Sequence, residues 1–558
     1  MSSTRERLKR AYPDMSVAPG TRHYTLLNSN DELPEDSELL AFLRSVISDA
    51  NVRLASLEEE ISTIQEKLIL LENQSVSLTS YGPAMPRSDA DAQLKEELSK
   101  IQETLILLEK KRASLSSYRA RNKAILSPLR RMPPEVLGDI FLWTLPSPSE
   151  VQNTFNVEDS PWTLTRISSR WREISLSTPS LWSRIIVDYR NAHHYPVPMA
   201  EAQIHRSRAR KLEIHFYGSE AASSGPQIQI FQLLLQHSSR WEALDLVLTA
   251  EIAPLLTALR AGFPSLQRLF IRSYVESPKS QTAVPSINCF RVAPFLVDLS
   301  VYGKHRFLSV TAPTCQLTHY CHNGSWKEHS RILKLAPNLI QANITVTFDD
   351  EPWPQSDEPI NMPYLQRLHV SRARCLDYLK APALEGLGLG FKRGEPPDIR
   401  ILRSFIGCSA CPLRRLCLRG LADVPTTTQI LQTLPSITEL VIFNKSRRKR
   451  TNALTEALTV SNVAGSAVIA PRLSFLLFVC GRGNSFDHTA YIQMVTSRWQ
   501  ATECALKSAV LLIESDPPLD PATFSSLDMH RREGLDFWHG PAGMKGMNAL
   551  LYAPSWHL

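Results

Sequence analysis

A proline-headed leucine pattern recurs through the second half of the chain, and it restricts the possible folds more than any other feature. The pattern is Pro-x-Leu-x-x-Leu-x-Leu, as in FPSLQRLFI, MPYLQRLHV and LPSITELVI. Its prolines, one of them in a degenerate copy at 313, are 19 to 36 residues apart, at positions 264, 294, 313, 337, 363, 382, 412, 435 and 471. Such periods are typical of leucine-rich solenoids. Segments 211–216 and 240–248 alternate in the same way, so we expect an irregular leucine-rich-repeat-like solenoid over residues 205–540.

Each Leu-x-Leu of this pattern is expected to form a short strand. Side chains alternate along a strand, so the leucines face a shared core and the residues between them face outward. Segments 330–336 and 426–434 are expected to form helices or loops that cover the opposite side. The outward positions are Arg268, Phe270, Arg272, Asp298, Tyr302, Arg367, His369, Arg415, Arg419, Glu439 and Phe443.

This outward surface is the candidate target-binding site. Arginines and aromatic residues are the types that most often anchor protein interfaces. The candidate target-binding residues are Arg268, Phe270, Tyr302, Arg367, His369, Arg415, Arg419 and Phe443. The competing interpretation of any single position is the solvated face of a structural sheet.

A duplicated heptad pattern precedes the solenoid. Leucine, isoleucine and alanine recur at alternating steps of three and four from Leu40 to Leu71, and again from Leu94 to Leu115. Segment 57–81 aligns with segment 94–118 at 16 of 25 positions, which indicates a tandem duplication. We expect coiled-coil helices over residues 38–125. The two copies either fold back on each other around Gly82 and Pro83 or pair between chains, and the pattern leaves both arrangements open.

A compact helical segment lies between these two regions, at residues 127–183. Pro133 and Pro134 begin a short helix, a second helix follows Ser160 and Pro161, and Thr178-Pro179 begins a final turn. Three helices in about 55 residues bury little surface on their own, so a unit of this size normally packs on a partner.

These residues resemble the F-box of F-box proteins. The resemblance consists of three blocks in order: PPEVLxxIF from Pro133, IxxxWRxI from Ile167, and TPxLW from Thr178. A heptad helix running into such a block is similar to a large fungal group of these proteins. Met132 and Ser168 depart from the family's usual leucine and cysteine. The resemblance implies that an adaptor binds Pro133, Pro134, Glu135, Leu137, Ile140, Phe141 and Trp171.

The resemblance also implies a function. The F-box would bind a Skp-type adaptor and, through it, a cullin, while the solenoid holds a protein target for ubiquitin transfer by other subunits of an SCF-type ligase. A coiled-coil scaffold acting outside any ligase is the alternative, and a hydrolase with dispersed catalytic residues is a third, weaker interpretation. The expected fold is mixed α and α/β: coiled-coil helices, a three-helix F-box and an irregular leucine-rich-repeat-like solenoid.

Other motifs are weaker. Cys408-x-x-Cys411 with Cys417 suggests zinc, but a tetrahedral site needs a fourth ligand, and buried structural cysteines are the better interpretation. The basic run 445–450 fits a solvated loop better than a nuclear signal or a nucleic-acid patch. The chain contains no P-loop, G-x-S-x-G, H-E-x-x-H or Rossmann fingerprint, so we expect neither an enzyme nor a cofactor.

Composition sets the remaining expectations. A chain of 558 residues predicts roughly three to four domain-sized units. Segment 1–37 is expected to be disordered and segment 541–558 to be a tail. The net charge of +7 is too small to indicate nucleic acid or a membrane surface. The apolar runs Phe475–Cys480 and Ala509–Ile513 are too short to span a bilayer. No secretory signal opens the chain, so we expect the cytoplasm or nucleus, with reduced thiols.

Overall fold

The structure is a computed structural model of the chain. It describes His23 and Trp353 and the ranges 37–79, 89–146, 156–190, 195–259, 262–273, 286–303, 308–347, 358–390, 398–420, 424–444, 450–460, 468–480, 487–513 and 528–541. The expected segments 1–37 and 541–558 lie outside these residues, apart from His23, Ser37 and Pro541.

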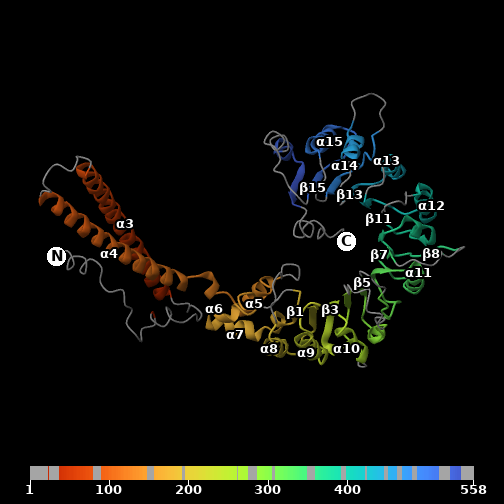
Figure 1. Ribbon diagram of the computed structural model, residues 1–558, viewed down its shortest axis with the longest axis horizontal. Helices are drawn as coiled ribbons and strands as arrows, with labels where there is room; N and C mark the ends of the chain where they lie inside the picture. Colours follow the sequence, from red (N-terminus) through yellow and green to blue (C-terminus); the bar gives the residue numbers. More distant parts are fainter. Residues whose placement is uncertain are drawn as a thin grey trace. The chain divides into compact units, whose positions relative to one another are not determined.

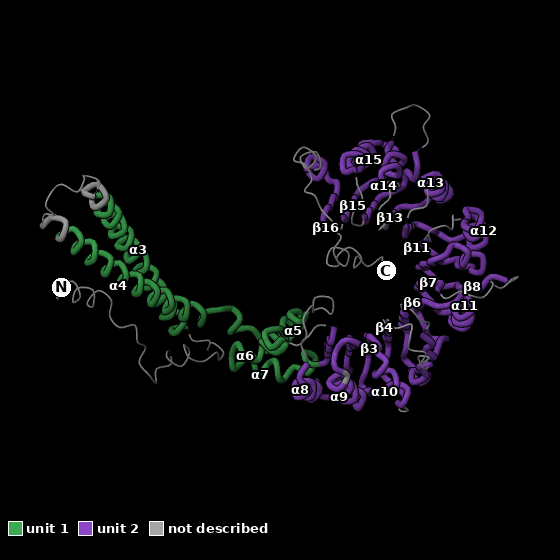
Figure 2. The backbone as a smooth tube through the Cα atoms, in the orientation of Figure 1, with its two compact units in different colours: residues 1–151, 156–182 green, residues 152–155, 183–558 purple. Residues whose placement is uncertain are grey.

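The chain forms two compact units (Figure 2). Unit 1 contains residues 1–151 and 156–182, and unit 2 contains residues 152–155 and 183–558. Two units are fewer than the chain length predicts. The reason is that a stacked array adds core with every repeat, so the size limit of a closed domain does not apply to it.

Unit 1 begins with a pair of long helices, α3 (Ser37–Thr79) and α4 (Asp89–Ile125), which lie side by side in opposite directions (Figure 1). The heptad positions form their contact. Leu57, Ile61 and Leu108 share one buried cluster, and Leu43 packs with Ile125. The structure therefore has the hairpin arrangement, in which the two copies of the duplicated sequence pack on each other within one chain.

The helix pair gives a first testable prediction. Leu108→Asp should open the hairpin, because Leu108 is 0 % exposed and a carboxylate in this seam is either desolvated or protonated at a cost of several kcal/mol. We expect hydrogen exchange to accelerate at least tenfold over α3 and α4 of the full-length protein. Ile106→Asp is the matched control, because Ile106 is 65 % exposed on the same helix. Equal protection in the two variants would contradict the observed packing.

The rest of unit 1 is a small helical module, residues 127–146 and 156–182. Its elements are η1 (Pro128–Arg130), α5 (Pro134–Trp143), α6 (Leu164–Ile167), α7 (Ser169–Ser177) and η2 (Pro179–Trp182). Pro134 stands at the first turn of α5, where the missing N–H costs nothing. The Ser168 side chain caps α7 by accepting a hydrogen bond from the Trp171 N–H at 3.1 Å.

Unit 2 is built on one parallel sheet of fourteen strands in the order β1-β2-β3-β4-β5-β6-β7-β9-β11-β12-β13-β14-β15-β16. The strands are β1 (Arg184–Asp188), β2 (Leu212–Tyr217), β3 (Trp241–Leu248), β4 (Arg268–Ser273), β5 (Asp298–Gly303), β6 (His319–Gly324), β7 (Gln341–Val346), β9 (Arg367–Val370), β11 (Gly386–Gly390), β12 (Arg415–Arg419), β13 (Glu439–Asn444), β14 (Phe475–Cys480), β15 (Ser508–Ile513) and β16 (Asp536–Pro541). A separate parallel pair joins β8 (Ile360–Asn361) to β10 (Leu379–Lys380).

Helices and short 3₁₀ turns connect these strands. They are α8 (Val197–Arg206), α9 (Ser224–Leu235), η3 (Ser238–Arg240), α10 (Ile252–Ala258), η4 (Cys289–Arg291), α11 (Trp326–Leu335), η5 (Ala373–Tyr378), α12 (Ile399–Ser409), α13 (Val424–Thr433), α14 (Arg450–Leu458) and α15 (His488–Gln500). Within unit 2 the strands follow the inner side of a curve and the helices its outer side (Figure 1). We call the strand face turned away from the helices the concave face.

The leucine repeat explains this arrangement. In the repeat headed by Pro264, Leu266, Leu269 and Ile271 are buried in the core shared with the helices, and Phe270 alternates to the concave face. The expected repeat of short strands with intervening helices is therefore confirmed, and its strands form one parallel sheet. It starts earlier than residue 205, because β1 pairs in parallel with β2 from Arg184 onward. β1 lacks the proline head, which is why the repeat pattern missed it.

Among the described residues, no helix is both long and apolar enough to cross a membrane.

Candidate functional site

The concave face carries three rows of side chains that run across the strands of the sheet, the third of them interrupted at the four-residue strand β9. Neighbouring strands pair in register, so that the first, third and fifth residues of most strands line up across the sheet. The first row contains Arg268, Asp298, Arg367, Arg415 and Glu439; the second contains Phe270 and His369; the third contains Arg272, Tyr302, Arg419 and Phe443. All the outward positions predicted from the sequence thus lie on one face. Their role in binding a target stays a prediction.

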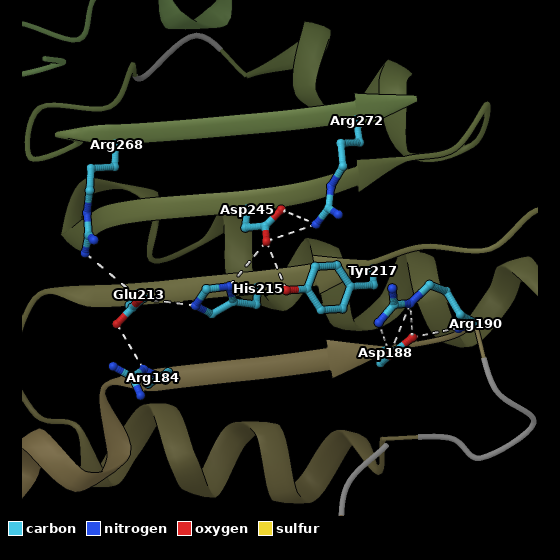
Figure 3. Close-up of polar contacts among 9 residues, drawn as sticks. All are labelled: Arg184, Asp188, Arg190, Glu213, His215, Tyr217, Asp245, Arg268 and Arg272. Carbon is cyan, nitrogen blue, oxygen red and sulfur yellow. Dashed lines mark hydrogen bonds and ion pairs between the residues drawn. The ribbon is translucent and has the colours of Figure 1, made fainter. Parts of the chain in front are cut away.

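The face changes character along its length, and its first part, β1–β4, is charged (Figure 3). Glu213 accepts a hydrogen bond from Arg184 Nε at 3.0 Å, and its other oxygen lies 3.2 Å from His215 Nε2. Asp245 accepts from the Tyr217 hydroxyl at 2.9 Å and forms an ion pair with Arg272 at 2.9 Å. These residues form the charged end of the concave face, together with Asp188, Arg190 and Arg268.

Electrostatics fixes the charge states at this end. The hydrogen bond from His215, helped by Arg184, lowers the pKa of Glu213 to about 2 against the opposing effect of burial. Burial disfavours protonation of His215, but Asp245 and Glu213 outweigh it and the pKa of His215 is raised. His215 Nδ1 is 3.6 Å from Asp245, an ion-pair distance longer than a hydrogen bond. The two carboxylates therefore favour the protonated, cationic form of His215.

Aromatic rings order the arginines of the charged end. The Arg190 guanidinium lies 4.4 Å from the centre of the Tyr217 ring, and that of Arg272 lies 4.5 Å from the centre of the Phe270 ring. The ion pairs of the charged end join Arg184, Arg190, Arg268 and Arg272 to only three carboxylates, those of Asp188, Glu213 and Asp245, which leaves a positive excess before His215 is counted. Ordered guanidinium groups of this kind bind carboxylates and aromatic rings of a partner. The arrangement is suited to recognition.

The middle of the face is shaped by glycines. β11 has the sequence GLGLG, and a Cβ on Gly388 would lie 2.5 Å from Cδ2 of His369 on the neighbouring strand. The imidazole of His369 occupies this space and its Nδ1 lies 3.0 Å from Asn343 Oδ1. His369 is therefore only 9 % exposed, and the expectation of an exposed binding histidine is wrong. Strand alternation predicted correctly that the His369 side chain is on the concave face. The repeat pattern alone could not show that Gly388 of the neighbouring strand lies beside it.

The last part of the face, β12–β15, is apolar. Its cluster consists of Cys417, Val441, Leu477, Val479, Val510 and Leu512, with Phe443 and Phe475 packed against them. We call this set the apolar end. Sequence reasoning missed it, although the continuous apolar runs of β13, β14 and β15 carry the signal, because a parallel strand buried on both faces loses its alternation.

The helical module holds the predicted adaptor-binding residues in two different settings. Pro133, Pro134 and Glu135 are exposed at the start of α5, and Ile140 and Trp171 are half-buried. Leu137 and Phe141 are buried in the module's own core, where Phe141 packs on Trp171 at 4.7 Å between ring centres. Residues at i and i+4 share a face of a helix, and this face points into the module, so both side chains pack inward; their role in adaptor binding stays a prediction.

The same helix exposes a second apolar face that sequence reasoning missed. Val136 and Trp143 are exposed, Trp143 to 88 %, and with half-buried Ile140 they stand at i, i+4 and i+7. Ile167 and Leu129 of the module are exposed as well. The helical spacing of Val136, Ile140 and Trp143 was visible in the sequence; which of the two apolar faces is the inner one was not.

The weaker motifs do not assemble into sites. Cys417 points to the concave face while Cys408 and Cys411 lie at and just after the end of α12, and within the described ranges no group of three potential metal ligands occurs. The basic run 445–450 lies outside the described residues except for Arg450. A scan of protein-family models and a search of curated proteins found no match to this chain.

Proposed function

We propose that this protein is the substrate-recognition subunit of an SCF-type ubiquitin ligase. In this proposal the helical module is an F-box that binds a Skp-type adaptor and through it a cullin, and the leucine-rich-repeat-like concave face binds a protein target. Ubiquitin transfer takes place on other subunits, so the chain needs no catalytic residue, metal or cofactor of its own. Such complexes act in the cytoplasm and nucleus.

The second apolar face of α5 is the observation that carries the proposal. A helix of ten residues that packs Leu137 and Phe141 inward and still presents Val136 and Trp143 to solvent has apolar surface for two partners. Exposed tryptophans are rare on a surface that binds nothing, and tryptophan is enriched among residues that dominate binding energy. The order of the three sequence blocks that resemble the F-box supports the same assignment.

The test is a double substitution on that face. Val136→Asp with Trp143→Asp should weaken binding of a purified Skp-type adaptor at least tenfold by calorimetry, because both apolar contacts are lost and charges are left at the interface. The module should stay folded, because neither side chain is in its core. Val52→Asp is the control: Val52 is an exposed apolar residue on α3, and its replacement should leave adaptor binding unchanged.

Leu137→Ala separates folding from binding. Leu137 is 1 % exposed, so its truncation should destabilise the module by about 2–5 kcal/mol and weaken binding only through unfolding. Full-strength adaptor binding by a folded Val136→Asp, Trp143→Asp variant would refute the F-box assignment.

The alternative is a coiled-coil scaffold acting outside a ligase. It is favoured by apolar residues that the hairpin leaves exposed, among them Ile69, Leu70 and Ile106. A protein that shows no adaptor binding but sediments as an oligomer, and becomes monomeric when Leu70 and Ile106 are replaced by aspartate, would support the scaffold instead.

A further inference from the structure

The apolar end of the concave face is buried, although no helix belongs to it. Its six central residues are at most 5 % exposed. The helices of this region contribute to the other core: Leu431 of α13, Leu454 of α14 and Val495 of α15 pack there with the inward residues of the strands. The cluster of the apolar end consists of strand residues alone.

An open sheet face of this composition would be costly. Valine, leucine and phenylalanine side chains on the three adjacent strands β13–β15, with Cys417 on β12, form a contiguous apolar patch, and monomeric proteins rarely leave large patches of this kind in water. The patch carries little charge: Glu439 and Arg415 pair with each other at 3.0 Å at one margin, and the guanidinium of Arg419 lies 5.4 Å from the centre of the Phe443 ring. An occupant that fits it is apolar, extended and nearly uncharged.

We propose that residues 542–558 of this chain pack across the apolar end. The segment reads AGMKGMNALLYAPSWHL, in which Lys545 is the single fully charged side chain. Its large apolar residues are Met544, Met547, Leu550, Leu551, Tyr552, Trp556 and Leu558. This composition matches the apolar end and not the charged end, where arginines and carboxylates already pair with each other.

The distances permit this contact. The segment continues from Pro541, the last residue of β16, and β16 pairs directly with β15, which carries Val510 and Leu512. Four strand spacings separate β16 from β12, about 19 Å at roughly 4.8 Å per step. Seventeen extended residues reach about 56 Å, so the segment can cross the whole patch.

Such a segment acts as an intramolecular competitor. It covers the same face on which the proposed function places the target, so a target that uses the apolar end has to displace it. This consequence rests on the proposed function, whereas the packing of the segment does not.

Cys417 provides a native probe, because it lies in the apolar end and burial raises the pKa of its thiol to about 11. We would pulse the protein with iodoacetamide and measure labelling by mass spectrometry. Truncation after Pro541 should label Cys417 at least tenfold faster than in the full chain. Cys480, buried on the helix side of β14, should stay unlabelled, and exposed Cys315 should label equally in both proteins. A synthetic peptide of residues 542–558 should restore the protection of Cys417 in the truncated protein.

Substitutions in the full chain give a second arm. Leu550→Asp with Leu551→Asp should expose Cys417 as truncation does, while Asn548→Asp, which adds a charge at a polar position, should not. If truncation exposes Cys480 as well, the truncated protein has unfolded. The comparison of the Leu550→Asp, Leu551→Asp variant with the Asn548→Asp variant then tests the proposal in its place. Three results would overturn the proposal. The first is equal labelling of Cys417 in the full and the truncated protein, and the second is equal protection of Cys417 in the Leu550→Asp, Leu551→Asp variant and the Asn548→Asp variant. The third is protection that disappears on dilution, which would assign the cover to a second copy of the chain.

Discussion

Unit 2 is expected to lose several kcal/mol of stability as the pH falls from 6.5 to 5. Three histidines in it are buried in their neutral form. Burial lowers the pKa of His322 to about 4, that of His329 to about 3 and that of His369 to about 3. In the unfolded chain each returns to about 6.5.

Burial is the main reason why His329 resists protonation, and the neighbouring His322 lowers its pKa further against the opposing effect of the hydrogen bond to Thr345. The Nε2–H of His329 donates to the carbonyl oxygen of Thr345 at 3.3 Å, which leaves Nδ1 to accept from the Tyr320 hydroxyl at 2.9 Å. A proton on Nδ1 would reverse the bond to Tyr320, whose oxygen would then have to accept, and would leave the Tyr320 hydroxyl hydrogen without this acceptor. It would also place a cation 5.7 Å, between ring centres, from His322 in the same core.

The direction of this change in stability with pH follows from proton uptake by the unfolded chain. Below pH 6.5 the unfolded chain binds protons that the folded chain excludes, so the stability that these histidines contribute is complete above pH 6.5 and is lost as the pH falls toward their folded pKa values. At about 1.4 kcal/mol per unit, each histidine costs roughly 2 kcal/mol at pH 5. His215 acts in the opposite direction, because its raised pKa adds stability that is lost as the pH rises through the folded value.

Denaturant unfolding at several pH values measures this effect. His329→Gln should reduce the slope of stability against pH between 6 and 5 by about a third, because one of three groups is removed. His205→Gln is the control, because His205 is exposed on α8. A flat profile in the unmodified protein, or equal slopes in the two variants, would contradict the neutral burial of these rings.

The second large effect is expected at Arg498, which is 1 % exposed and holds three backbone segments together. Its guanidinium donates to the carbonyl oxygens of Leu458, Ala470 and Ile469, at 2.7, 3.2 and 2.6 Å. Arg498→Met keeps much of the volume and removes every donor. Each buried carbonyl left without a donor costs about 1–3 kcal/mol, so we expect a loss of about 3 kcal/mol or more.

The loss should be local. Neighbouring repeats contact only each other, so hydrogen exchange should accelerate in β14–β16 and stay slow in β2–β5. Arg472→Met, two residues from Ala470 but exposed, should change stability by no more than about 0.5 kcal/mol. Equal exchange in the two variants would show that Arg498 does not brace this part of the sheet.

The repeat pattern predicted the sheet well because it encodes a local rule. Phe270 lies between Leu269 and Ile271, and alternation alone sends it to the concave face. The heptads likewise predicted helices with an apolar contact, but hairpin and oligomer bury the same leucines, so the pattern could not choose between them.

The errors share one physical cause: they depend on what a neighbouring element supplies. His369 is buried because Gly388 of the next strand leaves room for its ring, and no feature of the segment RLHV records this. Leu137 and Val136 are adjacent on one helix with an apolar stripe on each side, and only packing shows which is inner. Strands β13–β15 have too many apolar residues for alternation to reveal that both faces are covered.

The parallel register has a consequence for how such a chain can diversify. Each proline-headed turn precedes its strand at a nearly constant distance, whereas the spacing between successive prolines varies from 19 to 36 residues. All strands run in one direction, so residues added directly after a strand join the same rim of the sheet each time. Insertions and deletions there change the rim without shifting a single pair in the three rows. Evolution can therefore change this rim of the concave face by insertions and deletions, whereas the interior of the face changes only by substitution. The rim and the interior can thus evolve separately.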